Sequence, residues 1–240
     1  NSGLPVTMVE RDQESLERGI ENVKKVYRRD VEKGRLSQEK ADKILSNYST
    51  STHLKDLSDK DMIIEAVFEE LDVKKGVFSQ LNDIAKEGAV LASNTSYLDI
   101  DKIASATDRV GDVIGLHFFS PANIMRLLEI VVPTNVNDDV VATGFQLAKI
   151  LKKVPVRAGN CDGFIGNRVL ENYAKAANYM MEDGTSPYDI DKAIVEFGYP
   201  MGPFQMFDLA GGDIGWADRK RKAAFRSNEE RYVSIADRIC

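Results

Sequence analysis

The chain has 240 residues, of which 43% are hydrophobic and 29% charged, the composition of an ordinary globular protein with material for one large domain or two modest ones. Its formal net charge of −6 argues against nucleic-acid binding, and no stretch approaches the roughly 18 apolar residues of a membrane span. The two cysteines, Cys161 and Cys240, follow no metal-ligand spacing, which favours a reduced, intracellular setting and no metal site.

The first expected element is a strand at residues 4–10, preceded by three residues, Asn1 to Gly3, that resemble the end of a helix. In a doubly wound α/β fold, the segment before this strand would be the first strand, a glycine-rich phosphate-binding turn and the first helix. No G-x-G-x-x-G pattern occurs in the sequence, so we expect the first strand and this turn to be absent from the chain. Glu10 ends the expected strand, where an acidic residue binds a ribose in such folds, although most acidic residues at strand ends simply face solvent.

Two helical patterns follow. Hydrophobic residues recur every three or four positions from Leu16 to Val31, and Ser37 is the expected N-cap of a second helix. Two helices where one crossover helix would suffice predict a helical arm, residues 15–46, over the nucleotide-binding domain. A strand is then expected at residues 50–57, where His53 lies among polar residues and is given no role.

Further buried strands are expected at residues 62–67 and 89–92, separated by a helix that opens near Glu69. The second of these strands runs directly into four small polar residues, Ser93 to Ser96. Such a run is either a helix cap or the polar floor of a ligand site, and the pattern leaves both open.

His117 lies at the end of an apolar strand predicted at residues 113–118, and ligands bind at the carboxyl ends of strands in open α/β sheets. It is either a proton-exchanging group or a packed histidine satisfied by a backbone carbonyl.

Glu129 interrupts the apolar strand predicted at 127–132, where a buried carboxylate needs a partner. His117 is the nearest candidate in sequence, and a carboxylate holding one imidazole nitrogen would leave the other free as a general base. The alternative places Glu129 at a strand end in water.

A helix near 139–151 and a short strand at 154–156 complete the first half, and no strand pattern follows. Helices are expected from Phe164 to Met181, after Ser186, and after Gly202. Alternating strands and helices predict an α/β fold with a Rossmann-like, mainly parallel sheet in residues 1–157 and a smaller all-helical domain in residues 158–240. Asn167, near the start of the interdomain helix, is either a surface polar residue or a second donor beside the His117–Glu129 pair.

Basic residues gather at residues 24–29 and at 219–222. Such runs are typical of a solvated helix face, although an anionic ligand could use one.

Five ordered stretches of the sequence resemble the 3-hydroxyacyl-CoA dehydrogenase family. They are Ser93-Asn94-Thr95-Ser96, Leu116-His117-Phe118-Phe119-Ser120-Pro121, Leu128-Glu129, Asp162-Gly163-Phe164-Ile165-Gly166-Asn167-Arg168 and Gly198-Tyr199-Pro200-Met201-Gly202-Pro203-Phe204. Their separations also match the family, and together they span nearly the whole chain. Asp213-Ile214-Gly215-Trp216 is similar to the multifunctional, peroxisomal bifunctional-type members of the family.

The resemblance implies NAD-dependent oxidation of an (S)-3-hydroxyacyl-CoA to the 3-ketoacyl-CoA in fatty acid β-oxidation. It implies that His117 is the general base, that Glu129 orients it, and that Ser96 and Asn167 bond to the reacting oxygen or the thioester carbonyl. It further places Glu10, Glu69, Lys74 and Ser96 on cofactor-binding positions. The helical arm would meet the CoA moiety.

The multifunctional branch also implies a fused hydratase/isomerase domain, a homodimer through the helical domain, and a peroxisomal location, with the mitochondrial matrix or the bacterial cytoplasm as alternatives. The absent phosphate turn motivates an alternative from a different class, a non-catalytic acyl-CoA-binding or structural fragment without a productive NAD site.

Overall fold

The fold was determined as a computed structural model, which describes residues 2–227, 229 and 231–238. Asn1 and Cys240, which enter the sequence-based interpretation, lie outside the described residues.

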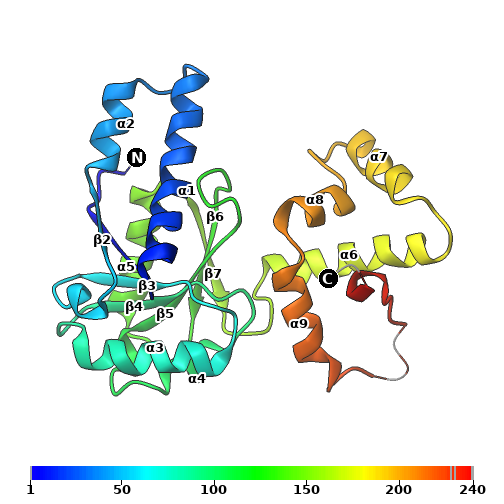
Figure 1. Ribbon diagram of the computed structural model, residues 1–240. Coiled ribbons are helices and arrows are strands. Elements are labelled where there is room, and N and C mark those ends of the chain that lie inside the picture. Colours follow the sequence, from blue (N-terminus) through cyan, green and yellow to red (C-terminus); the bar gives the residue numbers. More distant parts are fainter. Residues whose placement is uncertain (1, 228, 230, 239–240) are drawn as a thin grey trace.

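A five-stranded sheet forms the centre of the first half of the chain (Figure 1). Its strands are β3 (Met62–Glu65), β4 (Val90–Ser93), β5 (Val113–Phe118), β6 (Leu127–Val132) and β7 (Val154–Gly159), in that spatial order. All neighbours are parallel except β5 and β6, because the eight residues between these two strands are too few for a parallel crossover. The predicted mainly parallel, Rossmann-like sheet is confirmed.

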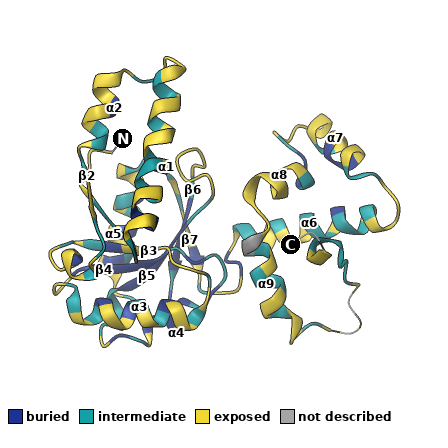
Figure 2. Ribbon diagram, in the orientation of Figure 1, coloured by how far each residue is buried: buried dark blue, intermediate teal, exposed yellow. Residues whose placement is uncertain are grey.

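Helices cover both faces of this sheet (Figures 1 and 2). On one face, α3 (Leu71–Ile84) and α4 (Ile100–Ala104) pack Phe78 and Ile103 against the sheet. On the other face, α5 (Asp138–Ile150) packs Val140 and Ala148 against it. Burial on both faces explains why these strands are continuous apolar runs in the sequence.

The N-terminal region forms a separate two-stranded parallel sheet of β1 (Val6–Val9) and β2 (Tyr48–Ser51). Between these strands, α1 (Gln13–Glu32) and α2 (Gln38–Leu45) extend away from the central sheet, where the sequence places the helical arm (Figure 1). Ser37 caps α2 as predicted, since its side chain accepts a hydrogen bond from the amide of Lys40.

The strand expected at residues 50–57 is wrong from residue 52 onward. β2 ends at Ser51, whose hydroxyl accepts a hydrogen bond from the amide of His53 and so turns the chain. A 3₁₀ helix, Leu54–Leu57, follows; two other short 3₁₀ helices are Val110–Asp112 and Ile235–Arg238. His53 is exposed.

The second half of the chain is helical, as predicted, with α6 (Gly166–Glu182), α7 (Pro187–Phe197), α8 (Pro203–Ala210) and α9 (Asp213–Ala223). β7 continues two residues beyond the predicted domain end at residue 157, so a division there would cut a strand. The linker between the two halves is residues 160–165. In the described part of the chain, no helix combines the length and apolar character needed to cross a membrane.

Candidate active site

The centre of the site is a buried histidine–carboxylate pair. His117 and Glu129 face each other across the antiparallel strands β5 and β6, and His117 Nδ1 lies 2.7 Å from Glu129 Oε2. The Glu129 side chain is fully buried and that of His117 is 5% exposed. The predicted pairing of these two residues is therefore present, and Glu129 does not lie at a strand end in water.

Glu129 also fixes the beginning of α6. Its Oε1 accepts hydrogen bonds from the backbone amides of Ile165 at 3.0 Å and Gly166 at 2.8 Å. Burial alone would raise the pKa of Glu129, but the hydrogen bonds from His117, Gly166 and Ile165 together hold that pKa below its usual value. The side chain is thus ionised near neutral pH and accepts a hydrogen bond from Nδ1–H, which leaves Nε2 of His117 as the free acceptor nitrogen.

These bonds also explain why the helix predicted from Phe164 begins at Gly166 instead. Phe164 has a positive φ of 48°, and the chain turns there before the helix starts. The Phe164 ring then packs 5.6 Å from the imidazole of His117, and that of Phe119 packs at 4.4 Å.

The polar run Ser93–Ser96 is not a helix cap, because the N-cap of α4 is Asp99. Three of its residues hold this segment in place through side-chain hydrogen bonds. Ser93 Oγ donates to Glu65 Oε2. Asn94 Oδ1 accepts from the amide of Phe118, and Thr95 Oγ1 accepts from the amide of Leu98. Among the described residues, the Ser96 hydroxyl has no such partner, and Ser96 lines the cleft that His117 also lines.

Asn167 completes this wall of the cleft. Its Nδ2 donates a hydrogen bond to the backbone oxygen of Ser96 at 3.2 Å, so the first turn of α6 is tied to the loop after β4. Asn167 is therefore not an isolated surface residue. The structure brings Ser96, His117 and Asn167 to one cleft, with Glu129 directly behind the histidine.

Glu69 and Lys74 lie beside this wall. One oxygen of Glu69 accepts hydrogen bonds from the Thr95 hydroxyl at 2.5 Å and from the amides of Ser96 at 2.7 Å and Tyr97 at 3.0 Å. Glu69 thus holds the Ser96 loop in place and also lines the cleft.

The family resemblance places Lys74 on a cofactor-binding position, and in the structure its side chain is buried beside Glu69. Its side chain is 1% exposed and is absent from the cleft wall. The ammonium group bonds to Glu65 Oε1 at 2.7 Å and to the backbone oxygen of Val67 at 3.2 Å, and it lies 3.5 Å from Glu69 Oε2. Lys74 therefore neutralises the buried Glu65 and lies beside Glu69, which lines the cleft.

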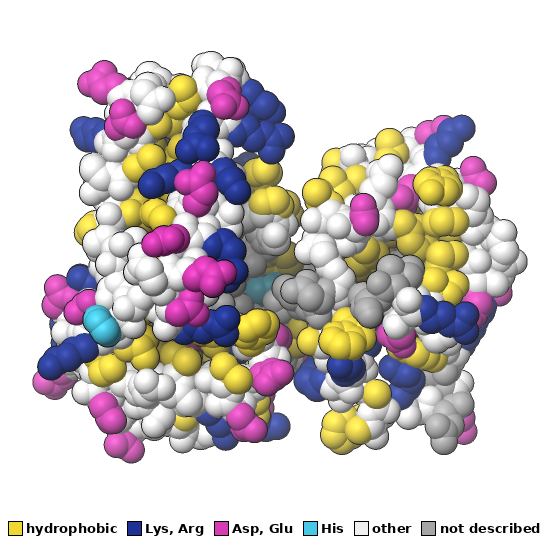
Figure 3. Space-filling model, viewed as in Figure 1, with side chains coloured by type: hydrophobic (Ala, Val, Ile, Leu, Met, Phe, Trp, Pro, Cys, Tyr) yellow, Lys and Arg dark blue, Asp and Glu magenta, His cyan; other side chains and the backbone are white. Residues whose placement is uncertain are grey.

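Glu10 lies immediately after β1, on the wall of the same cleft. No described residue forms a hydrogen bond or ion pair with its carboxylate. The cleft has a volume of about 3830 Å³, several times the 300–1,000 Å³ that is usual for one small ligand. Figure 3 shows hydrophobic side chains on both sides of the gap between the two halves of the molecule.

These features define a class of protein. A mainly parallel sheet with helices on both faces, an acidic residue directly after a strand, and a histidine–carboxylate pair on two adjacent strands are typical of an α/β dehydrogenase with a second, helical domain. Glu10 and Ser96 both line this cleft, and no glycine-rich turn is found in the chain. No group of described residues has the side chains and spacing to hold a metal ion.

Comparison with known proteins identifies the family. The family model of the 3-hydroxyacyl-CoA dehydrogenase NAD-binding domain matches residues 1–161, and that of the C-terminal domain matches residues 163–240. The chain belongs to the 3-hydroxyacyl-CoA dehydrogenase family, as the resemblance of its motifs predicted.

Individual relatives agree with this assignment. The chain is 41% identical over 251 residues to the peroxisomal bifunctional enzyme of Cavia porcellus, an alignment that covers 99% of the chain and 34% of that enzyme. It is similar to the crystal structure of M. tuberculosis FadB2, with a TM-score of 0.93, 33% identity, and coverage of 99% of this chain and 85% of that one. The dehydrogenase part of multifunctional enzyme 1 from C. elegans has a TM-score of 0.66 and 29% identity, with coverage of 99% and 54%.

The chain spans about a third of the length of the curated relatives it matches. The alternative interpretation, a non-catalytic fragment, receives no support from these comparisons.

Sequence reasoning missed Glu65, a fully buried carboxylate that bonds to Lys74, to the Ser93 hydroxyl and to the amide of Val67. The signal was present, because Glu65 ends an apolar strand just as Glu129 interrupts one. The same argument, that a buried carboxylate needs a partner, would have found it.

Proposed function

We propose that the chain carries NAD-dependent oxidation of an (S)-3-hydroxyacyl-CoA to the 3-ketoacyl-CoA, the dehydrogenase step of fatty acid β-oxidation. One observation carries the proposal: His117, at the cleft wall, is held through Nδ1 by a buried and ionised Glu129. That arrangement presents Nε2 as a proton acceptor near neutral pH.

In this reaction, Nε2 of His117 takes the proton of the substrate 3-hydroxyl group. The carboxylate of Glu129 stabilises the resulting imidazolium without moving, because three hydrogen bonds already fix it. NAD, when bound, supplies the acceptor for the hydride that leaves C3. Glu10 and Ser96 would hold the cofactor from the cleft wall, with Glu69 and Lys74 keeping the Ser96 loop in place.

Ser96 and Asn167 would bind the substrate oxygens. The Ser96 hydroxyl and the second N–H of the Asn167 amide have no partner among the described residues, and both side chains lie on the cleft wall. Two hydrogen-bond donors beside the base would stabilise charge that develops on the reacting oxygen or polarise the thioester carbonyl.

The relatives support a wider setting for this activity. The Cavia porcellus relative is named a peroxisomal bifunctional enzyme, and its length leaves room for further domains. We therefore propose a peroxisomal location, a fused hydratase/isomerase domain, and a homodimer through the helical half. We also propose that the boundary between the two domains lies in the linker, residues 160–165.

The test compares the two histidines in the full-length protein, with oxidation of NADH by acetoacetyl-CoA as the readout. Replacing His117 with Gln should lower kcat by about 10²- to 10⁴-fold through loss of the general base. Replacing the exposed His53 with Gln is the matched control and should leave kcat unchanged. An unaltered kcat in His117→Gln would overturn the proposal.

A further inference from the structure

Two residues of the basic run on α9, Arg221 and Lys222, form ion pairs with carboxylates while remaining partly exposed to solvent. Lys222 Nζ lies 3.0 Å from Asp218 Oδ2, 3.2 Å from Glu171 Oε1 and 3.6 Å from Asp162 Oδ1. Arg221 Nη2 lies 2.5 Å from both Asp162 Oδ2 and Asp218 Oδ1. We call Asp162, Glu171, Asp218, Arg221 and Lys222 the charge cluster.

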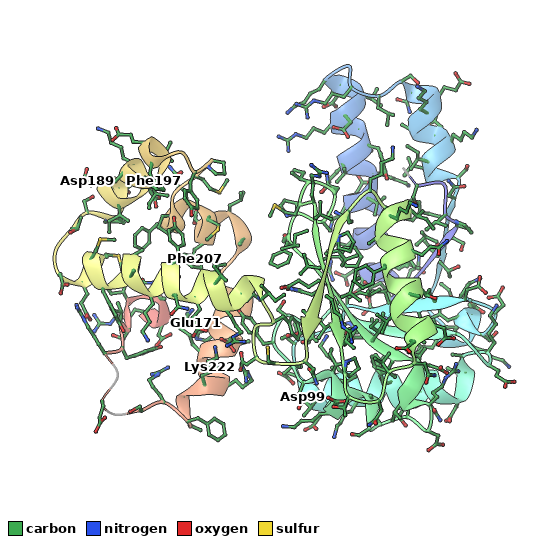
Figure 4. All side chains as sticks on the ribbon, turned by 180° about the vertical axis from the view of Figure 1, so that it is seen from behind. Asp99, Glu171, Asp189, Phe197, Phe207 and Lys222 are labelled. Carbon is green, nitrogen blue, oxygen red and sulfur yellow. The ribbon has the colours of Figure 1, made fainter. Side chains whose placement is uncertain are left out.

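The charge cluster joins α9 to two neighbouring segments that lie more than 50 residues earlier in the chain. Asp162 belongs to the linker, Glu171 to α6, and the other three residues to α9. Figure 4 shows Glu171 and Lys222 close together, on the side of the helical half that is nearest the linker. A fourth segment is included because Lys222 Nζ lies 5.6 Å from the ring centre of Tyr97, in the loop after β4.

Asp162 of the charge cluster and its neighbour Tyr97 both lie close in sequence to residues of the proposed active site. Asp162 lies three residues before Ile165, whose amide bonds to Glu129. Tyr97 directly follows Ser96, whose backbone oxygen accepts the hydrogen bond from Asn167. A shift of α9 would therefore be transmitted to the start of α6 on one side and to the Ser96 loop on the other.

Charge holds α9 more than packing does. None of residues 215–223 is buried, so the part of α9 whose side chains the structure describes contributes little to a hydrophobic core. Burial acts to lower the pKa of Lys222, but its hydrogen bond to Asp218 and the surrounding carboxylates raise that pKa above the usual value. Lys222 and Arg221 thus remain charged in the cluster across the physiological pH range.

We propose that Lys222 and Arg221 are positioning residues that hold α9 against the linker and Tyr97, and thereby set the distance between the start of α6 and the Ser96 loop. In this role they act through Glu129, Ser96 and Asn167 and do not exchange a proton with the substrate. The kinetic part of this inference rests on the proposed function, whereas its structural part does not.

The structural part is tested by measuring the distance between the two halves of the full-length protein. Spin labels would be attached to cysteines introduced at Glu87 and Glu196, both exposed, with the native cysteines replaced by serine. The parent protein should give one narrow distance distribution. Lys222→Met should broaden it, and Lys222→Arg should restore it because the charge is kept.

Two further variants keep this test decisive. Lys220 lies next to the charge cluster in sequence but stacks on Trp216 at 3.2 Å, so Lys220→Met should leave the distribution narrow. Asp162→Asn removes the linker partner of both cations and should broaden it even if Lys222→Met does not fold. An unchanged distribution in Asp162→Asn and Lys222→Met, or equal broadening in Lys220→Met, would overturn the proposal.

Kinetics with NADH and acetoacetyl-CoA separates this inference from the proposed function. Lys222→Met should lower kcat/KM by about 10- to 100-fold through misplaced groups, with Lys222→Arg restoring most of it. A broadened distribution with unchanged kcat/KM would contradict the kinetic part. Absence of any dehydrogenase activity in the parent protein would contradict the proposed function and leave the role of the charge cluster in holding α9 intact.

Discussion

Glu129 Oε1 accepts a hydrogen bond from the backbone amide of Gly166 at 2.8 Å, while Oε2 of the same carboxylate holds His117 at 2.7 Å. One side chain therefore orients the proposed base and marks the first residue of the helix that carries Asn167. The geometry of the base and the position of the helical half are coupled through a single carboxylate.

Replacing Glu129 with Gln tests this coupling. The amide oxygen can still accept the bonds from Ile165 and Gly166, but its NH₂ group would donate to Nδ1 and place the imidazole proton on Nε2. We expect kcat to fall by about 10²- to 10⁴-fold, because the nitrogen that faces the cleft can then no longer accept a proton. Steady-state kinetics measures this change, and Glu196→Gln on the surface of α7 is the control. A higher KM with an unchanged kcat would argue against control of the His117 tautomer by Glu129.

Stability should depend on pH through the same residue. The pKa of Glu129 is lower in the folded chain than in the unfolded one, so between these two values the unfolded chain binds more protons and stability rises with pH. The stabilising contribution is therefore complete above the unfolded pKa of about 4.3 and is lost as pH falls through the lower folded pKa. Urea denaturation of the parent and of Glu129→Gln at a series of pH values should show stability curves that are furthest apart near pH 7 and approach each other as the pH falls below the unfolded pKa. Parallel curves would contradict this prediction.

Lys74 should matter for stability because it neutralises buried Glu65. Lys74→Met leaves that carboxylate unpaired and should lower the free energy of unfolding by about 3–5 kcal/mol. Adding Glu65→Gln should recover part of the loss, since no unpaired buried charge then remains. Lys75→Met, one residue along, is the control for the helix itself. If the stability losses of Lys74→Met and Glu65→Gln simply add in the double variant, the pairing of Lys74 with Glu65 is not the cause.

Gly166 should be sensitive to the smallest added side chain. A Cβ there would lie 2.6 Å from Phe119 Cζ, so the ring that packs on His117 would have to move. Gly166→Ala should therefore lower kcat/KM by about tenfold or more, as misplaced catalytic groups do. Gly76→Ala, in the open space of α3, is the matched control and should raise stability by about 0.5–1 kcal/mol with no kinetic effect. Normal kinetics in Gly166→Ala would show that Phe119 has no role in placing the histidine.

The fold and the His117–Glu129 pair could be predicted because both follow from local pattern. Strands such as Val113–Phe118 are uniformly apolar, and a carboxylate inside such a strand requires a partner from a neighbouring one. The family resemblance of the motifs then identified the chemistry, which the family models support.

Other features depend on packing between distant residues. The burial of Lys74 depends on how α3 packs against the sheet, which the sequence does not show. The ion pairs of the charged run on α9 are not visible in the sequence, because Asp162, which pairs with Lys222, lies 60 residues away. Glu65 was missed although its pattern was as clear as that of Glu129.

The central claim is that hydride passes from C3 of the substrate to NAD under the control of His117. The most direct measurement is oxidation of (S)-3-hydroxybutyryl-CoA carrying deuterium at C3, followed by mass spectrometry of the nucleotide. We predict that each molecule of NADH formed by the full-length protein carries one deuterium, and that His117→Gln forms NADH far more slowly. No NADH formation, or NADH without deuterium, would contradict the account.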